Sequence, residues 1–108
     1  MLKREDGRVD WSRPAEEIRN RIHGCNPSPG AYTHRAGTLL KLWRAEVVPG
    51  DAGAAPGTVL DTRGPVVAAG SGAVRLLEVQ PENRPRSSGE AFSNGYRLEA
   101  GERWGDDR

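Results

Sequence analysis

The first regular pattern of apolar and polar positions lies near the start of the chain. Ala15, Ile18 and Ile22 repeat at the spacing of one helix face, with mostly charged residues between them. Ser12 is the expected N-cap, because a serine hydroxyl at that position accepts an otherwise unpaired backbone N–H. Gly24 is typical of the position just after a helix. The pattern therefore predicts one amphipathic helix of about 10–12 residues.

After a stiff corner at residues 25–32, which contains two prolines, the pattern changes to a period of two. Between residues 39 and 48, Trp43, Ala45 and Val47 are expected on one face. Polar residues between them then point the other way. This alternation predicts a β-strand.

Shorter strand patterns follow, separated by turns rich in glycine and proline. Ser87 and Glu90 have the spacing of a capping box, and Asn94-Gly95 is expected to end a short helix there. A last short strand is expected at residues 96–98. The other predicted strands lie at residues 57–62, 65–69 and 73–80.

One helix followed by four or five short strands predicts a mainly β fold, a small closed or partly closed β-barrel preceded by one amphipathic helix. Closure would remove the exposed edges of so small a sheet. With 108 residues, the chain can form one modest core. We expect a linker or arm at residues 1–10, the barrel domain at 11–100 and a polar tail at 101–108.

Composition narrows the class of protein. Leu, Ile, Val and Phe make up only 19 residues, but the net charge of +1 is too small for a disordered chain. No apolar stretch approaches the roughly 20 residues of a membrane helix, and no secretory signal is visible. The sequence therefore indicates a cytoplasmic protein without a membrane partner.

Candidate catalytic and metal-binding residues are few. Cys25 lies close in sequence to His23 and His34, but we interpret it as a small core residue and both histidines as surface residues. A zinc site built from these three lacks a convincing fourth ligand. No phosphate-binding glycine loop precedes a helix, and no pair of carboxylates suggests acid–base chemistry. We predict no catalytic residue and no metal site in this chain.

The charge is distributed unevenly, and a basic half can mark the surface that binds a polyanion. Residues 1–44 carry a net charge of +4 and residues 45–108 carry −3. Trp11 and Trp43 are interpreted as packing residues, so any contact with nucleic acid should be mainly electrostatic. For so small a charge excess, a solvated surface without a partner is the favoured interpretation of the charge pattern alone. The candidate nucleic-acid-binding residues are Arg35, Lys41, Arg44, Arg84, Arg86 and Arg97.

Several segments together resemble a known family. They are EDGRVDWSRPA at residues 5–15, NPSPGAY at 26–32, LKLWRA at 40–45, PGTVL at 56–60, QPE at 80–82 and NGYRL at 94–98. In this order and spacing they closely resemble the C-terminal domain of methionyl-tRNA formyltransferases. The chain departs from the family pattern where Ser93 replaces a leucine.

The resemblance implies an OB-like, partly open Greek-key β-barrel that helps to hold initiator methionyl-tRNA for N-formylation in translation initiation. The formyltransferase catalytic domain, in cis or in trans, would bind 10-formyltetrahydrofolate and carry the catalytic residues. Its motifs are absent here, so the resemblance implies no cofactor in this chain. The alternatives are the C-terminal domain of a formyltransferase acting on a nucleotide sugar or folate, and a protein-docking module without RNA binding.

Overall fold

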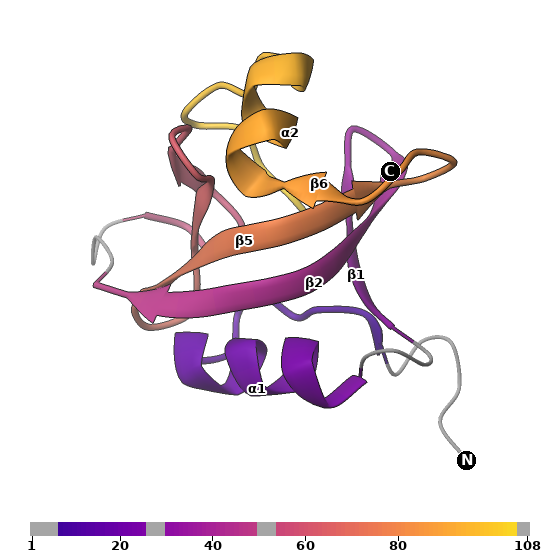
Figure 1. Ribbon diagram of the computed structural model, residues 1–108. Helices are drawn as coiled ribbons and strands as arrows, with labels where there is room; N and C mark the ends of the chain where they lie inside the picture. The colour runs from indigo at the N-terminus through magenta and orange to yellow at the C-terminus, as the bar shows by residue number, and fades with distance from the viewer. Residues whose placement is uncertain (1–6, 26–29, 50–53, 106–108) are drawn as a thin grey trace.

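The computed structural model describes residues 7–25, 30–49 and 54–105 and contains two helices and six strands in these ranges (Figure 1). The helices lie on opposite sides of the long pair of strands β2 and β5. In chain order the elements are α1 (Ala15–Cys25), β1 (Ala31–Arg35), β2 (Thr38–Val48), β3 (Val59–Asp61), β4 (Val66–Ala68), β5 (Ala73–Pro81), β6 (Ser87–Ser88) and α2 (Gly89–Tyr96).

The strands form one antiparallel sheet in the order β1-β2-β5-β4-β3, with β6 also paired to β5. On the edge of β5 away from β2, β4 pairs with residues 73–75 and β6 pairs with residues 78–79. The sheet curls without β1 and β3 pairing to each other. The prediction of a mainly β, partly open barrel preceded by a helix is confirmed.

The opening between β1 and β3 is bridged by the closing segment, residues 101–105. On one side, the Val59 N–H donates to the Glu102 carbonyl and the Trp104 N–H donates to the Gly57 carbonyl, both at 2.8 Å. On the other side, the Gly105 N–H donates to the His34 carbonyl at 2.9 Å. Backbone N–H and C=O groups at the open edges beside β3 and β1 thereby gain hydrogen-bond partners. This protects a small sheet from pairing with other chains.

The closing segment lies where a polar tail is expected. Trp104 is instead only 2% exposed and belongs to the hydrophobic core, because the backbone pairing with β3 and β1 turns its side chain inward. Residues 106–108 lie outside the described residues. At the other end, Val9, expected in an arm, is buried and its N–H donates to the Tyr32 carbonyl at 2.9 Å.

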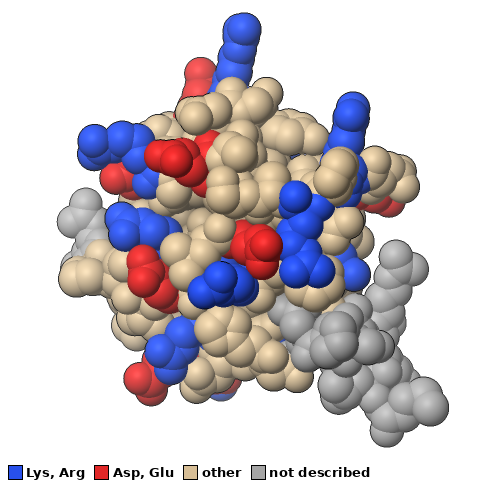
Figure 2. Space-filling model, viewed as in Figure 1, with Lys and Arg blue, Asp and Glu red and all other residues tan. Residues whose placement is uncertain are grey.

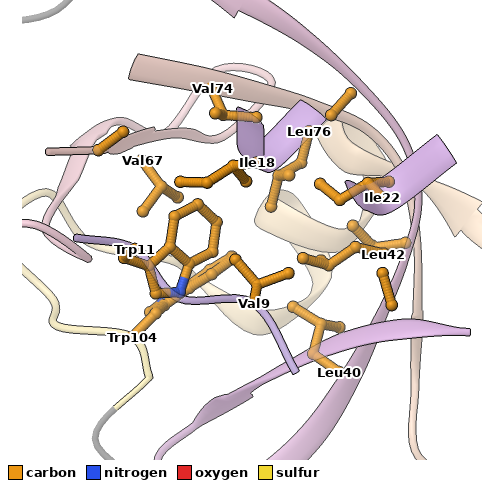
Figure 3. Packing of buried hydrophobic residues seen from close by; sticks show 14 of the residues in the cluster. Val9, Trp11, Ile18, Ile22, Leu40, Leu42, Val67, Val74, Leu76 and Trp104 are labelled. Atoms are coloured by element: carbon orange, nitrogen blue, oxygen red, sulfur yellow. The ribbon is translucent and has the colours of Figure 1, made fainter. Parts of the chain in front are cut away.

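The core fills the space between the curled sheet, α1, the residues before α1 and the closing segment. Figure 3 shows the side chains of Ile18 and Ile22 from α1 pointing toward Leu42 and Leu76 from β2 and β5. The predicted apolar stripe of the helix is therefore confirmed. Other labelled members of this cluster are Val9, Trp11, Leu40, Val67, Val74 and Trp104.

The helix α1 begins later than its expected N-cap. The Asp10 carboxylate accepts hydrogen bonds from the Ser12 hydroxyl at 2.6 Å and the Ser12 N–H at 3.0 Å, which hold the pKa of Asp10 below its ordinary value. The Ala15 N–H donates to the Ser71 carbonyl at 2.9 Å. The prediction of Ser12 as N-cap is thus wrong, because α1 begins at Ala15, whose N–H is satisfied by a tertiary contact.

The strand β2 changes its inward face between Leu42 and Ala45. Leu40, Leu42 and Ala45 are buried, and the pairing register with β5 is irregular at Arg44. The prediction that Trp43 shares a face with Ala45 is wrong, because the irregularity shifts the alternation by one residue. Trp43 lies on the outer face of the sheet, half-buried.

The helix α2 also differs from the expected pattern in its boundaries. Its N-cap is Ser88, whose hydroxyl accepts the Ala91 N–H at 3.0 Å, and not Ser87. Arg97 takes the left-handed conformation at φ 51° and ends the helix, so the strand expected at residues 96–98 is absent. Ser93 is buried, and its hydroxyl donates to the Thr62 carbonyl.

No helix in the described ranges is both long enough and apolar enough to span a membrane.

Candidate nucleic-acid interface

The outer face of β2 and β5 carries a group of cations built around one aromatic ring. The Lys41 ammonium lies 5.0 Å from the centre of a Trp43 ring, and the Arg86 guanidinium carbon lies 3.9 Å from it. The Trp43 Nε1–H donates to Gln80 Oε1 at 3.0 Å. The Gln80 side-chain amide donates in turn to the Arg84 carbonyl at 2.9 Å. We refer to these five residues, Lys41, Trp43, Gln80, Arg84 and Arg86, as the Trp43 cluster.

Strand pairing explains why these residues meet. Because Leu40 and Leu42 point into the core, Lys41 and Trp43 point outward. Lys41 pairs directly with Gln80 of β5. Ser87 of β6 pairs with Val79 of β5, which brings the preceding residue Arg86 back over the sheet. The cluster thus depends on the core side of the same strands.

The charges around the cluster are mixed. Arg86 lies 3.7 Å from the Glu78 carboxylate, and its side chain is 48% exposed. In the view of Figure 2, blue and red side chains are interspersed and form no continuous basic surface. Cations held over a ring and only partly paired can still contact phosphate, because arginine has five N–H donors.

Arg35 has a different environment from the other candidates. Its Nε and one terminal nitrogen donate to the two Glu102 carboxylate oxygens at 2.9 and 3.0 Å. Its guanidinium carbon lies 5.8 Å from the centre of the Phe92 ring and 5.9 Å from that of Tyr96. Such a bidentate pair fixes both side chains. Arg35 therefore joins β1 to the closing segment and to α2.

The electrostatics of Glu102 agree with this structural role. Burial raises the pKa of its carboxyl, but hydrogen bonds from Arg35, the Glu99 N–H and the Trp104 indole outweigh burial and leave the pKa below its ordinary value. The carboxylate is stabilised in its charged form.

The structure brings three of the six candidate residues together, places Arg44 beside them and leaves Arg35 and Arg97 apart from that group. Lys41, Arg84 and Arg86 belong to the Trp43 cluster. Arg44 is exposed and pairs through its backbone with Glu78, at the border of the cluster. Arg97 is exposed at the end of α2, next to the residue whose carbonyl accepts a hydrogen bond from Arg35.

Two residues of this surface were not identified from the sequence. The sequence predicts that Trp43 is a packing residue, and its pattern does not single out Gln80. A usable signal was present, because Leu40 and Leu42 alternate with Lys41 and Trp43 and would have indicated the outward face. The contact between Gln80 and Trp43 depends on the pairing of β2 with β5 and does not follow from the neighbours of Gln80 in the chain.

The histidines make contacts that fit structural roles. His23 Nε2 accepts the Ala45 N–H at 3.3 Å, where β2 changes its face. His34 packs edge-on against Tyr32, with the ring centres 5.7 Å apart. The side chain of Cys25 lies outside the described part of the chain. Within that part, no group of three or more His, Cys, Asp or Glu side chains could hold a metal ion.

Comparisons with known proteins identify a matching family. Residues 1–97 match the family described as formyl transferase, C-terminal domain. The chain is 48% identical over 106 residues to a methionyl-tRNA formyltransferase of Solibacter usitatus, covering 98% of this chain and 34% of that protein. It is 46% identical over 107 residues to one of Symbiobacterium thermophilum, covering 95% of this chain and 33% of that protein.

A solved structure supports the fold. HypX from Aquifex aeolicus, in complex with tetrahydrofolic acid, superposes with a TM-score of 0.69 at 20% identity and covers 94% of this chain and 19% of its own. At this identity the likeness shows the fold alone.

The curled sheet, the helix on one side and the closing segment define a small, partly open β-barrel domain. The chain belongs to the formyl transferase C-terminal domain family, as the resemblance predicts. It spans about a third of the length of the curated relatives, which are methionyl-tRNA formyltransferases.

Proposed function

We propose that this chain is a non-catalytic domain that holds the sugar-phosphate backbone of initiator methionyl-tRNA during N-formylation. The observation that carries the proposal is the Trp43 cluster, in which two cations are fixed over one ring and a third lies in the adjoining loop. The names of the curated relatives supply the substrate.

The proposal gives each partner a distinct task. A formyltransferase catalytic domain, in cis or in trans, performs the chemistry and binds 10-formyltetrahydrofolate. The present domain contributes binding energy and orientation only. We expect the complex to act in the cytoplasm, where translation begins.

A fixed cation suits this task better than a mobile one. Lys and Arg lose considerable rotamer freedom when they bind phosphate. Stacking over Trp43 restrains Lys41 and Arg86 before RNA arrives, and such preorganisation lowers the entropic cost of binding. Their affinity for phosphate remains largely electrostatic and therefore depends on salt.

The six candidate cations divide by role under this proposal. Lys41, Arg84 and Arg86 contact phosphate, with Arg44 at the border of the same surface. Arg97 provides a second point of contact near the end of α2. Arg35 positions the closing segment and α2 and does not bind RNA, because Glu102 already engages it.

The salt dependence of tRNA binding tests the proposal. If about four phosphates are neutralised, affinity should fall on the order of 100-fold between 50 and 200 mM salt. In the double variant Lys41→Ala/Arg86→Ala, we expect weaker binding and a salt slope reduced by about two phosphate contacts. Fluorescence anisotropy of labelled initiator tRNA measures both quantities.

A matched control removes the same charge elsewhere. Arg19 on α1 is half-buried, and Arg63 in the turn after β3 is exposed. The variant Arg19→Ala/Arg63→Ala should retain most of the affinity and the slope. Equal losses in both double variants would show binding by net charge alone. No salt-dependent binding of tRNA by the unchanged chain would exclude the proposal and favour another formyltransferase substrate or a docking role.

A further inference from the structure

An apolar groove of about 340 Å³ adjoins the Trp43 cluster. It lies between α2 and the loop that leads into β6. Its volume is at the lower end of small-molecule sites in proteins. The lining residues that matter here are Pro81, Arg84, Pro85, Arg86, Phe92 and Tyr96.

Tyr96 is the unusual member of this lining. Its side chain is 42% exposed, although most large apolar side chains in the described ranges are buried. The ring is nevertheless supported, because Phe92 packs against it with ring centres 4.7 Å apart and planes tilted by 30°. Arg35 donates to the Tyr96 carbonyl at 3.4 Å. A supported aromatic ring with an exposed surface is a ready stacking partner.

Charge indicates what kind of molecule the groove can hold. Arg84 and Arg86 line it, and none of the described lining residues is acidic. An occupant should therefore combine a flat apolar part with a nearby negative charge. An unpaired nucleotide has this combination, since every base offers a π-face and carries a phosphate beside it.

We propose that this groove receives the base of an unpaired RNA nucleotide, which stacks on Tyr96 while its phosphate contacts Arg84 or Arg86. The inference rests on the proposed function, because both arginines also belong to the Trp43 cluster. It extends that function from contact with the backbone to recognition of a single-stranded element. The groove favours no particular base, because stacking does not depend on the base edges.

The test compares two forms of one hairpin RNA, one blunt and one with a short single-stranded 3′ extension. We expect the unchanged chain to bind the extended form about tenfold more tightly, the size of effect given by one stacked base. The variant Tyr96→Ala should lose this gain and keep its affinity for the blunt form. Tyr96→Phe should keep the gain. A 2-aminopurine in the extension should lose fluorescence on binding to the unchanged chain and to Tyr96→Phe only.

The possible failures are distinguishable. Salt-dependent binding of both hairpins with equal affinity would overturn the groove inference and leave the proposed function intact. Absence of salt-dependent binding to either hairpin and to tRNA would overturn both. Equal RNA binding by all variants, with Tyr96→Ala losing affinity for a separately supplied formyltransferase catalytic domain, would assign the groove to a protein partner and overturn the inference.

Discussion

Two regions of this domain place an arginine over aromatic rings, and they use it differently. In the first region, where β1 and α2 meet the closing segment and which we call the closing region, Arg35 lies near Phe92 and Tyr96. Glu102 binds it through two hydrogen bonds of 2.9 and 3.0 Å. On the outer face of β2 and β5, Arg86 lies 3.9 Å from a Trp43 ring centre, and the nearest described carboxylate contact is 3.7 Å long.

The difference lies in how far the guanidinium donors are already satisfied. The Arg35 side chain is 21% exposed and donates to both Glu102 oxygens. The Arg86 side chain is 48% exposed, and its contact with Glu78 is loose. A tightly paired, partly buried arginine contributes to the fold, whereas a loosely paired, exposed one contributes little to stability and is available to a ligand. Residue type alone does not distinguish the two roles.

The tryptophans of the two regions provide the largest expected contrast in stability. Trp104 in the closing segment is almost fully buried, and Trp43 is half-buried on the outer face. Trp104→Ala should lower the free energy of unfolding by about 3–5 kcal/mol, because it leaves a large cavity and removes the anchor of the closing segment. Trp43→Ala should cost about 1 kcal/mol. Urea-induced unfolding followed by circular dichroism measures both.

Trp104→Phe provides the control if Trp104→Ala fails to fold. It retains an aromatic ring in the core and should recover part of the lost stability. Similar losses for Trp104→Ala and Trp43→Ala would contradict the division into a structural region and a proposed binding region.

Much of the fold could be predicted from the sequence because its signals are local. The stripe of Ala15, Ile18 and Ile22 indicates α1, and alternation indicates the long strand β2. The basic residues of the Trp43 cluster, Lys41, Arg84 and Arg86, are also identified as candidates from the sequence. Recognition of the family motifs adds the partly open barrel.

The remaining features depend on contacts between distant parts of the chain. Trp104 follows residues 99–103, which are mostly polar and have no strand pattern. Its burial depends on hydrogen bonds from the closing segment to Gly57 and His34. The outward position of Trp43 results from an irregularity shared by two paired strands. Gln80 acquires its role from strand pairing, in which it faces Lys41.

The ion pair of the closing region should show a characteristic pH dependence. Replacement of Glu102 by Gln removes the charge and keeps the shape, so Arg35 loses its charged partner. We expect a loss of about 1–2 kcal/mol in the free energy of unfolding at neutral pH. The pKa of Glu102 is lowered on folding, so its contribution is complete above the ordinary pKa of glutamate, about 4.3, and is lost as pH falls through the lowered pKa.

The difference between the unchanged chain and Glu102→Gln should therefore shrink below about pH 4. Urea-unfolding curves recorded at several pH values measure it. Glu82→Gln is the matched control, since Glu82 is exposed in the loop before β6; it should have little effect at any pH. A constant difference across the acid range would contradict the assigned role of the Arg35–Glu102 pair.

The smallest expected effect concerns α2, whose first residue follows β6 and whose last residue adjoins Arg35. The Ser88 hydroxyl accepts the Ala91 N–H and caps the helix. Ser88→Ala should therefore lower the free energy of unfolding by about 1 kcal/mol. Ser87→Ala is the matched control: the Ser87 hydroxyl donates only to the Ser88 carbonyl at 3.2 Å, so its loss should be a few tenths of a kcal/mol. Urea unfolding of both variants decides between the two serines, and a larger loss for Ser87→Ala would show that the cap lies one residue earlier.

Because Phe92 and Tyr96 are carried by α2, loosening its first turn should also weaken binding of the extended hairpin more than binding of the blunt one.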